Sequence, residues 1–127
     1  MIVGVGIDIV EVGRMEASIR KGSDRFLDRV FTSSERGRAG QGPSRFSDLA
    51  ALFAAKEAAL KALGTGWSDG IAWRDIEIVR GKDGGDSLAI VGRAGEIASG
   101  LGVKRVHLSL RGGVRMAAAV VILEGAA

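Results

Sequence analysis

Apolar positions along the chain follow two spacings, one typical of strands and one typical of helices. Residues 2–10 form an apolar run of the kind found in a buried strand, and only Asp8 interrupts it. Residues 106–110 alternate between apolar and polar side chains, which predicts a strand with one polar face. Residues 116–123 are almost wholly apolar and predict a central strand covered on both sides.

Helices are predicted between these strands. Apolar residues spaced three and four apart indicate a helix from Glu11 to about Arg20 and a second helix from Asp24, with a break at Gly22 and Ser23. Thr32 to Glu35 has the spacing of a capping box and predicts a short helical turn. A further short helix is expected over residues 92–101.

The longest predicted helix begins at a cap on Ser47, runs to Leu63 and ends at Gly64. Lys56 falls near the centre of its apolar face, so we expect an anion to lie against this ammonium group. The preceding segment, residues 37–44, holds the only proline and is predicted to be a mobile loop.

A hairpin completes the predicted elements. Residues 73–80 and 87–91 are expected to form its strands, joined through the glycine-rich segment 81–85. Gly112 and Gly113 are expected to turn the chain between the last two strands. Since strands and helices are mixed and no linker or repeat interrupts them, we expect one domain over residues 1–127 with an α+β fold.

Composition narrows the chemistry. The 127 residues are 46% hydrophobic, as expected for a globular core, and small enough that oligomerisation would help to bury apolar surface. Because the chain has no cysteine, a bound metal must be held by oxygen ligands or by the single histidine, His107. With no basic, apolar leader and no run of about 20 apolar residues, we expect a soluble, unprocessed, cytoplasmic protein with no membrane partner.

Positive charge is concentrated in about a quarter of the chain. Residues 14–45 hold eight basic and four acidic side chains, so this segment has a net charge of +4. The whole chain has a net charge of +3. Such a stripe attracts nucleic acid, a polyphosphate ligand or an acidic protein, or else it is simply a solvated helix face. Nucleic acid is the poorest of these fits, because only 5% of the residues are aromatic and none is tyrosine.

Two distant segments carry candidate chemistry. Asp8 lies within the first apolar run, and Glu57 and Lys61 stand one helical turn apart on a segment made mostly of alanine and leucine. Two carboxylates and a nearby cation are typical of a magnesium–phosphate site, with backbone amides at residues 64–66 able to approach a phosphate. The structural alternatives are a surface ion pair between Glu57 and Lys61 and a capping role for Asp8.

These segments also carry a resemblance to a known family. The chain resembles the holo-acyl-carrier-protein synthases, the short class of 4′-phosphopantetheinyl transferases, over essentially its whole length. The motifs that carry it are GIDIVEVGRM at 6–15, FTSSE at 31–35, FAAKEAALKALGTG at 53–66, WRDIE at 73–77 and HLSL at 107–110.

The resemblance implies transfer of the phosphopantetheine arm of coenzyme A to a serine of apo-acyl carrier protein, with magnesium, releasing adenosine 3′,5′-bisphosphate. It also implies a homotrimer with active sites between subunits, working in fatty acid biosynthesis and lipid metabolism. The positions that match family motifs are the metal ligands Asp8 and Glu57, the phosphate-binding Lys61 and the ligand contact His107. Gly64, Thr65, Gly66 and Arg45 are further candidate coenzyme A contacts. The candidates for docking the carrier are Arg14, which lies in a matched motif, and Arg20, Lys21, Arg25 and Arg29, which are placed by charge and helix position only. Glu57 and a metal-bound water are both candidates for the general base.

Two positions depart from the family pattern. Leu52 stands where an arginine usually precedes the FAAKE motif, and Arg111-Gly112 replaces a usual Ser-His pair. Arg111 could supply a different phosphate contact. A non-catalytic relative that binds coenzyme A or a carrier protein is therefore the alternative to an active transferase.

Overall fold

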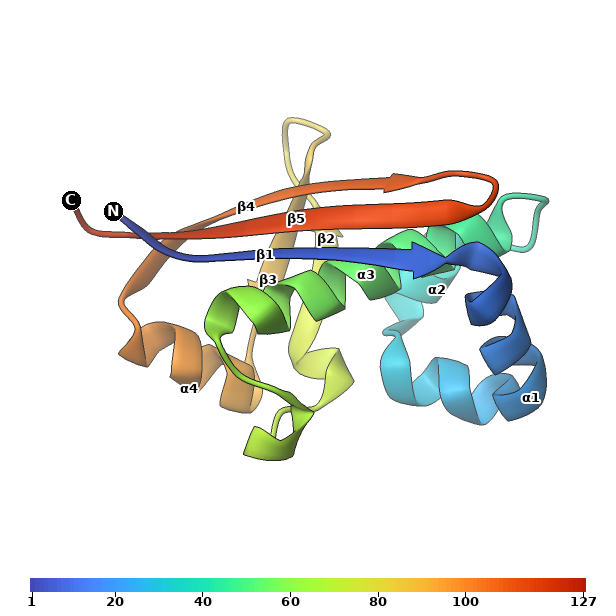
Figure 1. Ribbon diagram of the computed structural model, residues 1–127, viewed down its shortest axis with the longest axis horizontal. Coiled ribbons are helices and arrows are strands. Elements are labelled where there is room, and N and C mark those ends of the chain that lie inside the picture. Colours follow the sequence, from blue (N-terminus) through green and yellow to red (C-terminus); the bar gives the residue numbers. More distant parts are fainter.

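The structure is a computed structural model that describes residues 1–127, except for the side chain of Ser68. A three-stranded antiparallel sheet lies along the long helix α3 (Arg45–Leu63), with the other helices below and beside it (Figure 1). The sheet has the order β1-β5-β4, built from β1 (Ile2–Glu11), β5 (Met116–Gly125) and β4 (Val103–Gly112). A separate antiparallel hairpin pairs β2 (Ile76–Arg80) with β3 (Asp86–Ile90).

The remaining elements are short helices and one bent helix. They are α1 (Val12–Val30), α2 (Ser33–Ala39), α4 (Gly92–Gly100) and the 3₁₀ turns η1 (Trp67–Asp69) and η2 (Trp73–Asp75). The α+β fold expected from the sequence, with a mainly antiparallel sheet and one long helix, is confirmed. The expected break in the first helical segment is also present, because Ser23 within α1 has non-helical angles, φ 54° and ψ −147°.

Some expected boundaries differ from those observed. Ser44, not Ser47, stands at the N-terminus of α3, and its side chain makes no capping hydrogen bond. The strand expected from residue 73 begins at Ile76, since residues 73–75 form a 3₁₀ turn. The end of α3 is as expected, with Gly64 in the left-handed region at φ 73°.

Close approach of β1 to α3 depends on two glycines. A Cβ at Gly4 or Gly6 would overlap the backbone carbonyls of Ala62 and Ala58, which are four residues apart on the helix. Two residues of strand and four of helix both span about 6 Å, so the inward positions of β1 match successive turns of α3. Asp8 is the next inward position, and its neighbours across the sheet on this face are buried apolar residues such as Ala119 of β5.

The outward face of the same sheet corrects one expectation. The first strand was expected to be buried, yet Val5, Ile7 and Ile9 are 59%, 58% and 62% exposed. They pair in register with Ile122, Val120 and Ala118 of β5, which are only partly buried. The central place of β5 is as predicted, but α3 covers only one of its faces, and no element in the described part of the chain covers the other.

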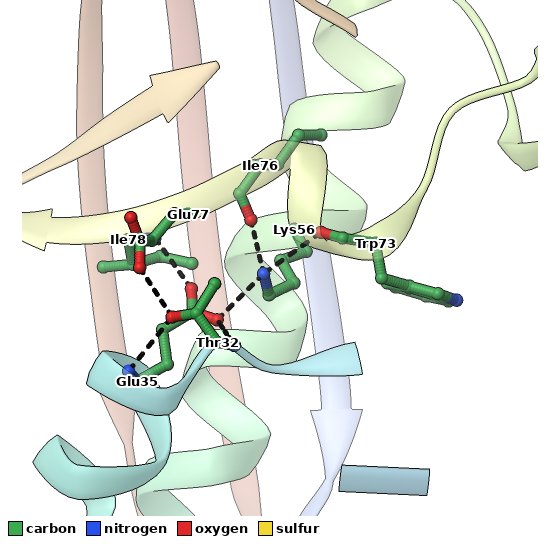
Figure 2. Close-up of polar contacts among 7 residues, drawn as sticks. All are labelled: Thr32, Glu35, Lys56, Trp73, Ile76, Glu77 and Ile78. Carbon is green, nitrogen blue, oxygen red and sulfur yellow. Dashed lines mark hydrogen bonds and ion pairs between the residues drawn. The ribbon is translucent and has the colours of Figure 1, made fainter. Parts of the chain in front are cut away.

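A buried ion pair joins α2 to α3. The Lys56 ammonium and the Glu35 carboxylate have no exposed side-chain surface, and Lys56 Nζ lies 3.0 Å from Glu35 Oε1. Lys56 also donates to the carbonyls of Ile76 and Trp73, the latter at 3.2 Å (Figure 2). The anion expected beside Lys56 is thus Glu35, and burial lowers the pKa of Lys56 although Glu35 opposes that change.

Glu35 connects three segments with one carboxylate. One oxygen accepts from the Thr32 amide at 2.9 Å in the expected capping box, and the other accepts from the Ile78 amide of β2 at 2.8 Å. The Thr32 hydroxyl in turn donates to Glu77 at 2.6 Å, as Figure 2 shows. Each buried polar group of this cluster therefore has a partner, as a buried charge requires.

Replacing Gly6 by alanine should destabilise the fold by about 3 kcal/mol or more, because the new methyl group meets a backbone carbonyl that cannot turn aside. The Gly13→Ala variant is the matched control. Gly13 lies in α1 with open space around its Cα, so this change should stabilise by about 0.5–1 kcal/mol. Urea unfolding of the two variants measures the difference, and equal stabilities would contradict the close approach of β1.

Candidate active site

Asp8 and Lys61 meet between β1 and α3. Asp8 points inward from its strand, and its Oδ1 accepts a hydrogen bond from Lys61 Nζ at 2.9 Å. The same ammonium donates to the Ile7 carbonyl at 3.0 Å. The Lys61 side chain is 54% exposed and that of Asp8 is 17% exposed, so the pair is open to solvent on one side. Asp8 is therefore neither a cap nor a turn residue, and Lys61 pairs with the strand.

Glu57 lies one helical turn before Lys61 and is half-buried. Its pKa is raised above the usual value, chiefly because burial removes water from the carboxylate. The Trp67 indole and the Lys61 ammonium oppose this change, while the Asp8 carboxylate adds to it. Two carboxylates and one ammonium group thus gather on one side of α3.

The donor set of this site is hard oxygen. Among the described residues, no group of three or more histidine, cysteine, aspartate or glutamate side chains could hold a metal ion. Magnesium, however, is commonly held by one or two carboxylates, with water and substrate phosphates as its other ligands. Asp8 and Glu57 are a suitable pair for such an ion. Its positive charge would also offset the cost of burying the Glu57 carboxylate in its charged form.

The loop of residues 64–66 directly follows α3 and begins three residues after Lys61. The amides of Gly64 and Thr65 donate to carbonyls of the last turn of α3, at 3.1 and 3.2 Å. The Gly66 amide lies 3.4 Å from Asp69, whose carboxylate also accepts from the Thr65 hydroxyl. The structure therefore shows this loop with its three amides directed within the chain.

Two other expected coenzyme A contacts lie elsewhere in the protomer. Arg45 begins α3 at the end opposite Lys61, and its guanidinium lies 5.2 Å from the centre of the Phe46 ring. His107 lies on the outward face of β4, where its Nε2 is 3.0 Å from Glu124 Oε1 and lowers the pKa of that carboxyl. A single chain therefore does not bring Arg45 or His107 together with Asp8 and Lys61.

The five expected docking residues all lie on α1 and are exposed. Arg20 pairs with Glu16 at 3.0 Å and also lies 5.4 Å from the centre of the Phe46 ring. The others are Arg14, Lys21, Arg25 and Arg29. The bend at Ser23 separates the first three basic residues of the set from the last two.

Both departures from the family pattern line one pocket of about 270 Å³. Leu52 and Arg111 lie on its wall together with Arg38 and Arg80. Arg38 holds Asp86 through two hydrogen bonds of 2.6 and 3.0 Å, and it lowers the pKa of that carboxyl. Among the described side chains, no ion pair engages Arg80 or Arg111, so the pocket favours an anion.

Sequence reasoning did not place Trp67 beside Glu57. Its indole is tilted against Trp73, with ring centres 3.7 Å apart, and Trp73 stacks on Phe53 of α3 at 5.0 Å. The signal available in the sequence was a tryptophan directly after a glycine-rich helix end. That signal becomes specific only when the path of the chain after α3 is known.

Known proteins match this chain over nearly its whole length. The family model of the 4′-phosphopantetheinyl transferase superfamily matches residues 4–119. The holo-[acyl-carrier-protein] synthase of Koribacter versatilis is 45% identical over 124 residues, 98% of this chain and 99% of that protein. The synthase of the same description from Anaeromyxobacter sp. (strain K) is 48% identical over 128 residues, 98% of each.

A solved structure agrees with these sequence matches. The crystal structure of a holo-(acyl-carrier-protein) synthase from Bacillus anthracis in complex with CoA (3′,5′-ADP) superposes with a TM-score of 0.79. It is 35% identical, and the match covers 99% of each chain. Fold and sequence thus define a transferase of the 4′-phosphopantetheinyl class. Within that class, the chain belongs to the holo-[acyl-carrier-protein] synthases, which confirms the resemblance given by its motifs. None of the helices described here is long and apolar enough to cross a membrane.

The raised pKa of Glu57 predicts that its charge opposes folding when no metal is bound. The resulting loss of folding stability is fully present above the pKa of Glu57 in the folded protein. It vanishes below the ordinary glutamate pKa of about 4.3. In the presence of a chelator, Glu57→Gln should therefore be more stable than the unchanged protein at pH 7.5, and the gain should disappear towards pH 4. Denaturant midpoints measure it, with Glu96→Gln as a control on the exposed surface of α4. A less stable Glu57→Gln protein at pH 7.5 would contradict this reading.

Proposed function

We propose that this protein transfers the 4′-phosphopantetheine group of coenzyme A to a serine of apo-acyl carrier protein in a magnesium-dependent reaction that releases adenosine 3′,5′-bisphosphate. The observation that carries the proposal is the meeting of Asp8, Glu57 and Lys61 between β1 and α3. Related synthases of known structure include one in complex with coenzyme A, which supports the same co-substrate here.

In this proposal the serine oxygen attacks the phosphorus that bears the pantetheine arm. The bond from that phosphorus to the bridging pyrophosphate oxygen breaks, and the adenosine bisphosphate leaves with the electron pair. Because the protein forms no covalent bond, its contribution is to position the reactants and to offset charge. A magnesium ion held by Asp8 and Glu57 would supply Lewis-acid stabilisation of the pyrophosphate oxygens.

Lys61 and Glu57 have separate roles in the proposed step. Lys61 is flexible and more than half exposed, so its ammonium can turn from Asp8 to the phosphate oxygens, where negative charge develops. A bound cation would offset the burial that raises the pKa of Glu57, so the carboxylate would be ionised there, and either it or a water at the ion would accept the serine proton. Gly64, Thr65 and Gly66 border this region and are proposed to lie against the pantetheine–pyrophosphate chain.

We further propose that the active protein is a homotrimer. The apolar surface formed by Val5, Ile7, Ile9, Val120 and Ile122 on the outward face of the sheet supports this, since contiguous exposed apolar patches of this kind mark interfaces. His107 lies on the same outward face, so in a trimer it would be available to the coenzyme A site of an adjoining copy. Arg45, at the far end of α3, is proposed to serve a neighbouring site in the same way.

Arg111 is proposed to bind a phosphate group of coenzyme A. Its pocket holds three arginines and the two carboxylates Asp48 and Asp86, and among the described side chains Arg38 is the one arginine of the three that is engaged in an ion pair. A guanidinium without a carboxylate partner is suited to phosphate. This supports catalytic competence in a chain that lacks the usual Ser-His pair.

The carrier protein is proposed to dock on α1. Its exposed row of Arg14, Arg20, Lys21, Arg25 and Arg29 would attract an acidic partner. We place this reaction in fatty acid biosynthesis in the cytoplasm and assign residues 1–127 to one domain, consistent with a cysteine-free chain of this size.

Incubation of apo-acyl carrier protein with this protein, coenzyme A and magnesium should add the mass of one phosphopantetheine to the carrier. Asp8→Asn and Glu57→Gln should lower the rate at least about 100-fold, because each removes a charge that the reacting phosphates require. A chelator should stop the reaction, and Glu96→Gln should leave it unchanged. A folded protein that binds coenzyme A but modifies no carrier would instead favour the non-catalytic alternative.

Sedimentation equilibrium should give the mass of three chains. Ile7→Lys should reduce this to one chain with little loss of monomer stability, because Ile7 is already exposed in the protomer and a lysine there can be buried only at high cost. Val114→Lys is the matched control, since Val114 is 93% exposed at the β4–β5 turn, away from the apolar surface. A monomeric unchanged protein would refute the trimer.

A further inference from the structure

The indole N–H of Trp67 is a buried donor without a hydrogen bond. Trp67 Nε1 has almost no exposed surface and no partner of normal hydrogen-bond geometry among the described residues. Leaving a buried N–H unpaired costs about 1–3 kcal/mol, so such a group in a native structure calls for an explanation. An indole can only donate, so its partner must be an acceptor.

Aromatic packing places this N–H against the catalytic side of α3. Phe53 and Glu57 are four residues apart and therefore neighbours on the helix surface. Trp73 stacks on Phe53, with an angle of 28° between the rings, and Trp67 lies against Trp73. The Trp67 ring is thus held beside the helix turn that presents Glu57. The Trp67 side chain also lies near enough to Glu57 to interact with its carboxylate.

The loop that delivers Trp67 is itself fixed. Gly64 adopts φ 73°, which turns the chain back from the end of α3 at a position that favours glycine. Asp69 then holds the turn by accepting from the Thr65 hydroxyl and lying 3.4 Å from the Gly66 amide. Both ends of the segment that carries Trp67 are therefore anchored, and the indole has little freedom to move away from Glu57.

We propose that Trp67 is a positioning residue whose indole N–H donates a hydrogen bond to the Glu57 carboxylate and so orients that carboxylate toward a divalent cation. This inference rests on the proposed function, because it assigns Glu57 as a ligand of the cation. Groups that hydrogen-bond to a metal-ligating side chain typically change metal affinity 10- to 100-fold. Without such a donor, the carboxylate of the half-buried Glu57 would be free to rotate away from the cation.

The test compares two single substitutions in the same aromatic stack. Trp67→Phe keeps a ring but removes the N–H beside Glu57, whereas Trp73→Phe removes the other indole N–H and keeps a ring between Phe53 and Trp67. Mn²⁺ is the probe, and the signal of the free ion in electron paramagnetic resonance reports how much is bound with coenzyme A present. Trp67→Phe should weaken Mn²⁺ binding about tenfold, and Trp73→Phe should leave it within about twofold of the unchanged protein.

The kinetics and fluorescence give independent readouts. For Trp67→Phe, the metal concentration giving half-maximal rate should rise about tenfold, while kcat at saturating metal changes little. Because the chain has two tryptophans, Trp73→Phe leaves Trp67 as the single emitter, and its emission should shift when Mg²⁺ and coenzyme A bind. Equal Mn²⁺ affinity in Trp67→Phe and the unchanged protein, or equal losses in both Phe variants, would overturn the proposal.

Glu57→Gln separates this inference from the proposed function. If Glu57→Gln binds Mn²⁺ as tightly as the unchanged protein, Glu57 is no ligand, and both the proposed metal site and the role of Trp67 fail. If Glu57→Gln loses Mn²⁺ but Trp67→Phe does not, the metal site stands and only the role of Trp67 fails. Circular dichroism and thermal unfolding of each variant establish that the compared proteins are folded.

Discussion

The buried ion pair between Lys56 and Glu35 is the interaction on which the rest of the arrangement depends. It joins α2 to α3, and through the Ile76 carbonyl and the Ile78 amide it also holds β2. Removing one partner of such a pair leaves an uncompensated buried charge, so neither residue can change alone. Because Lys56 is turned into this cluster, the next residue, Glu57, is turned out of it. The pair therefore fixes the rotation of α3 as well as its neighbours.

The second constraint acts from the opposite side of the helix. Gly4 and Gly6 allow the backbone of β1 to lie directly on α3, and this contact brings the following inward residue, Asp8, within reach of Lys61. The side of α3 that carries Glu57 and Lys61 is thus defined by one contact that sets how the helix is rotated and another that sets how near the strand lies. The two glycines act by having no side chain, and their role is seen from the backbone atoms that a Cβ at either position would overlap.

Much of this arrangement could be predicted from the sequence, and the failures have physical reasons. The spacing of Glu57 and Lys61, the capping box at Thr32 and the glycine at the end of α3 are local patterns that were identified correctly, whereas the cap expected at Ser47 was not. An anion was predicted beside Lys56, but the sequence did not identify it as Glu35, which lies 21 positions away. Glu35 had been assigned to the capping box, a role that it also has. The first strand was expected to be buried because it is apolar, but its outward residues are exposed. An apolar run alone does not show whether other parts of the same chain cover it. The place of Trp67 beside Glu57 was not predicted, because it depends on the chain folding back after Gly64.

The bend in α1 has a consequence for shape recognition. Ser23 takes a positive φ that serine rarely adopts, so the two halves of α1 follow different axes and its basic residues are divided between them. A straight rod of regularly spaced negative charge, such as a nucleic acid duplex, can align with only one half at a time. A compact partner with a curved acidic surface can meet both halves together. The backbone angle of a single residue can thus discriminate between anions that the charge of the helix alone would treat alike.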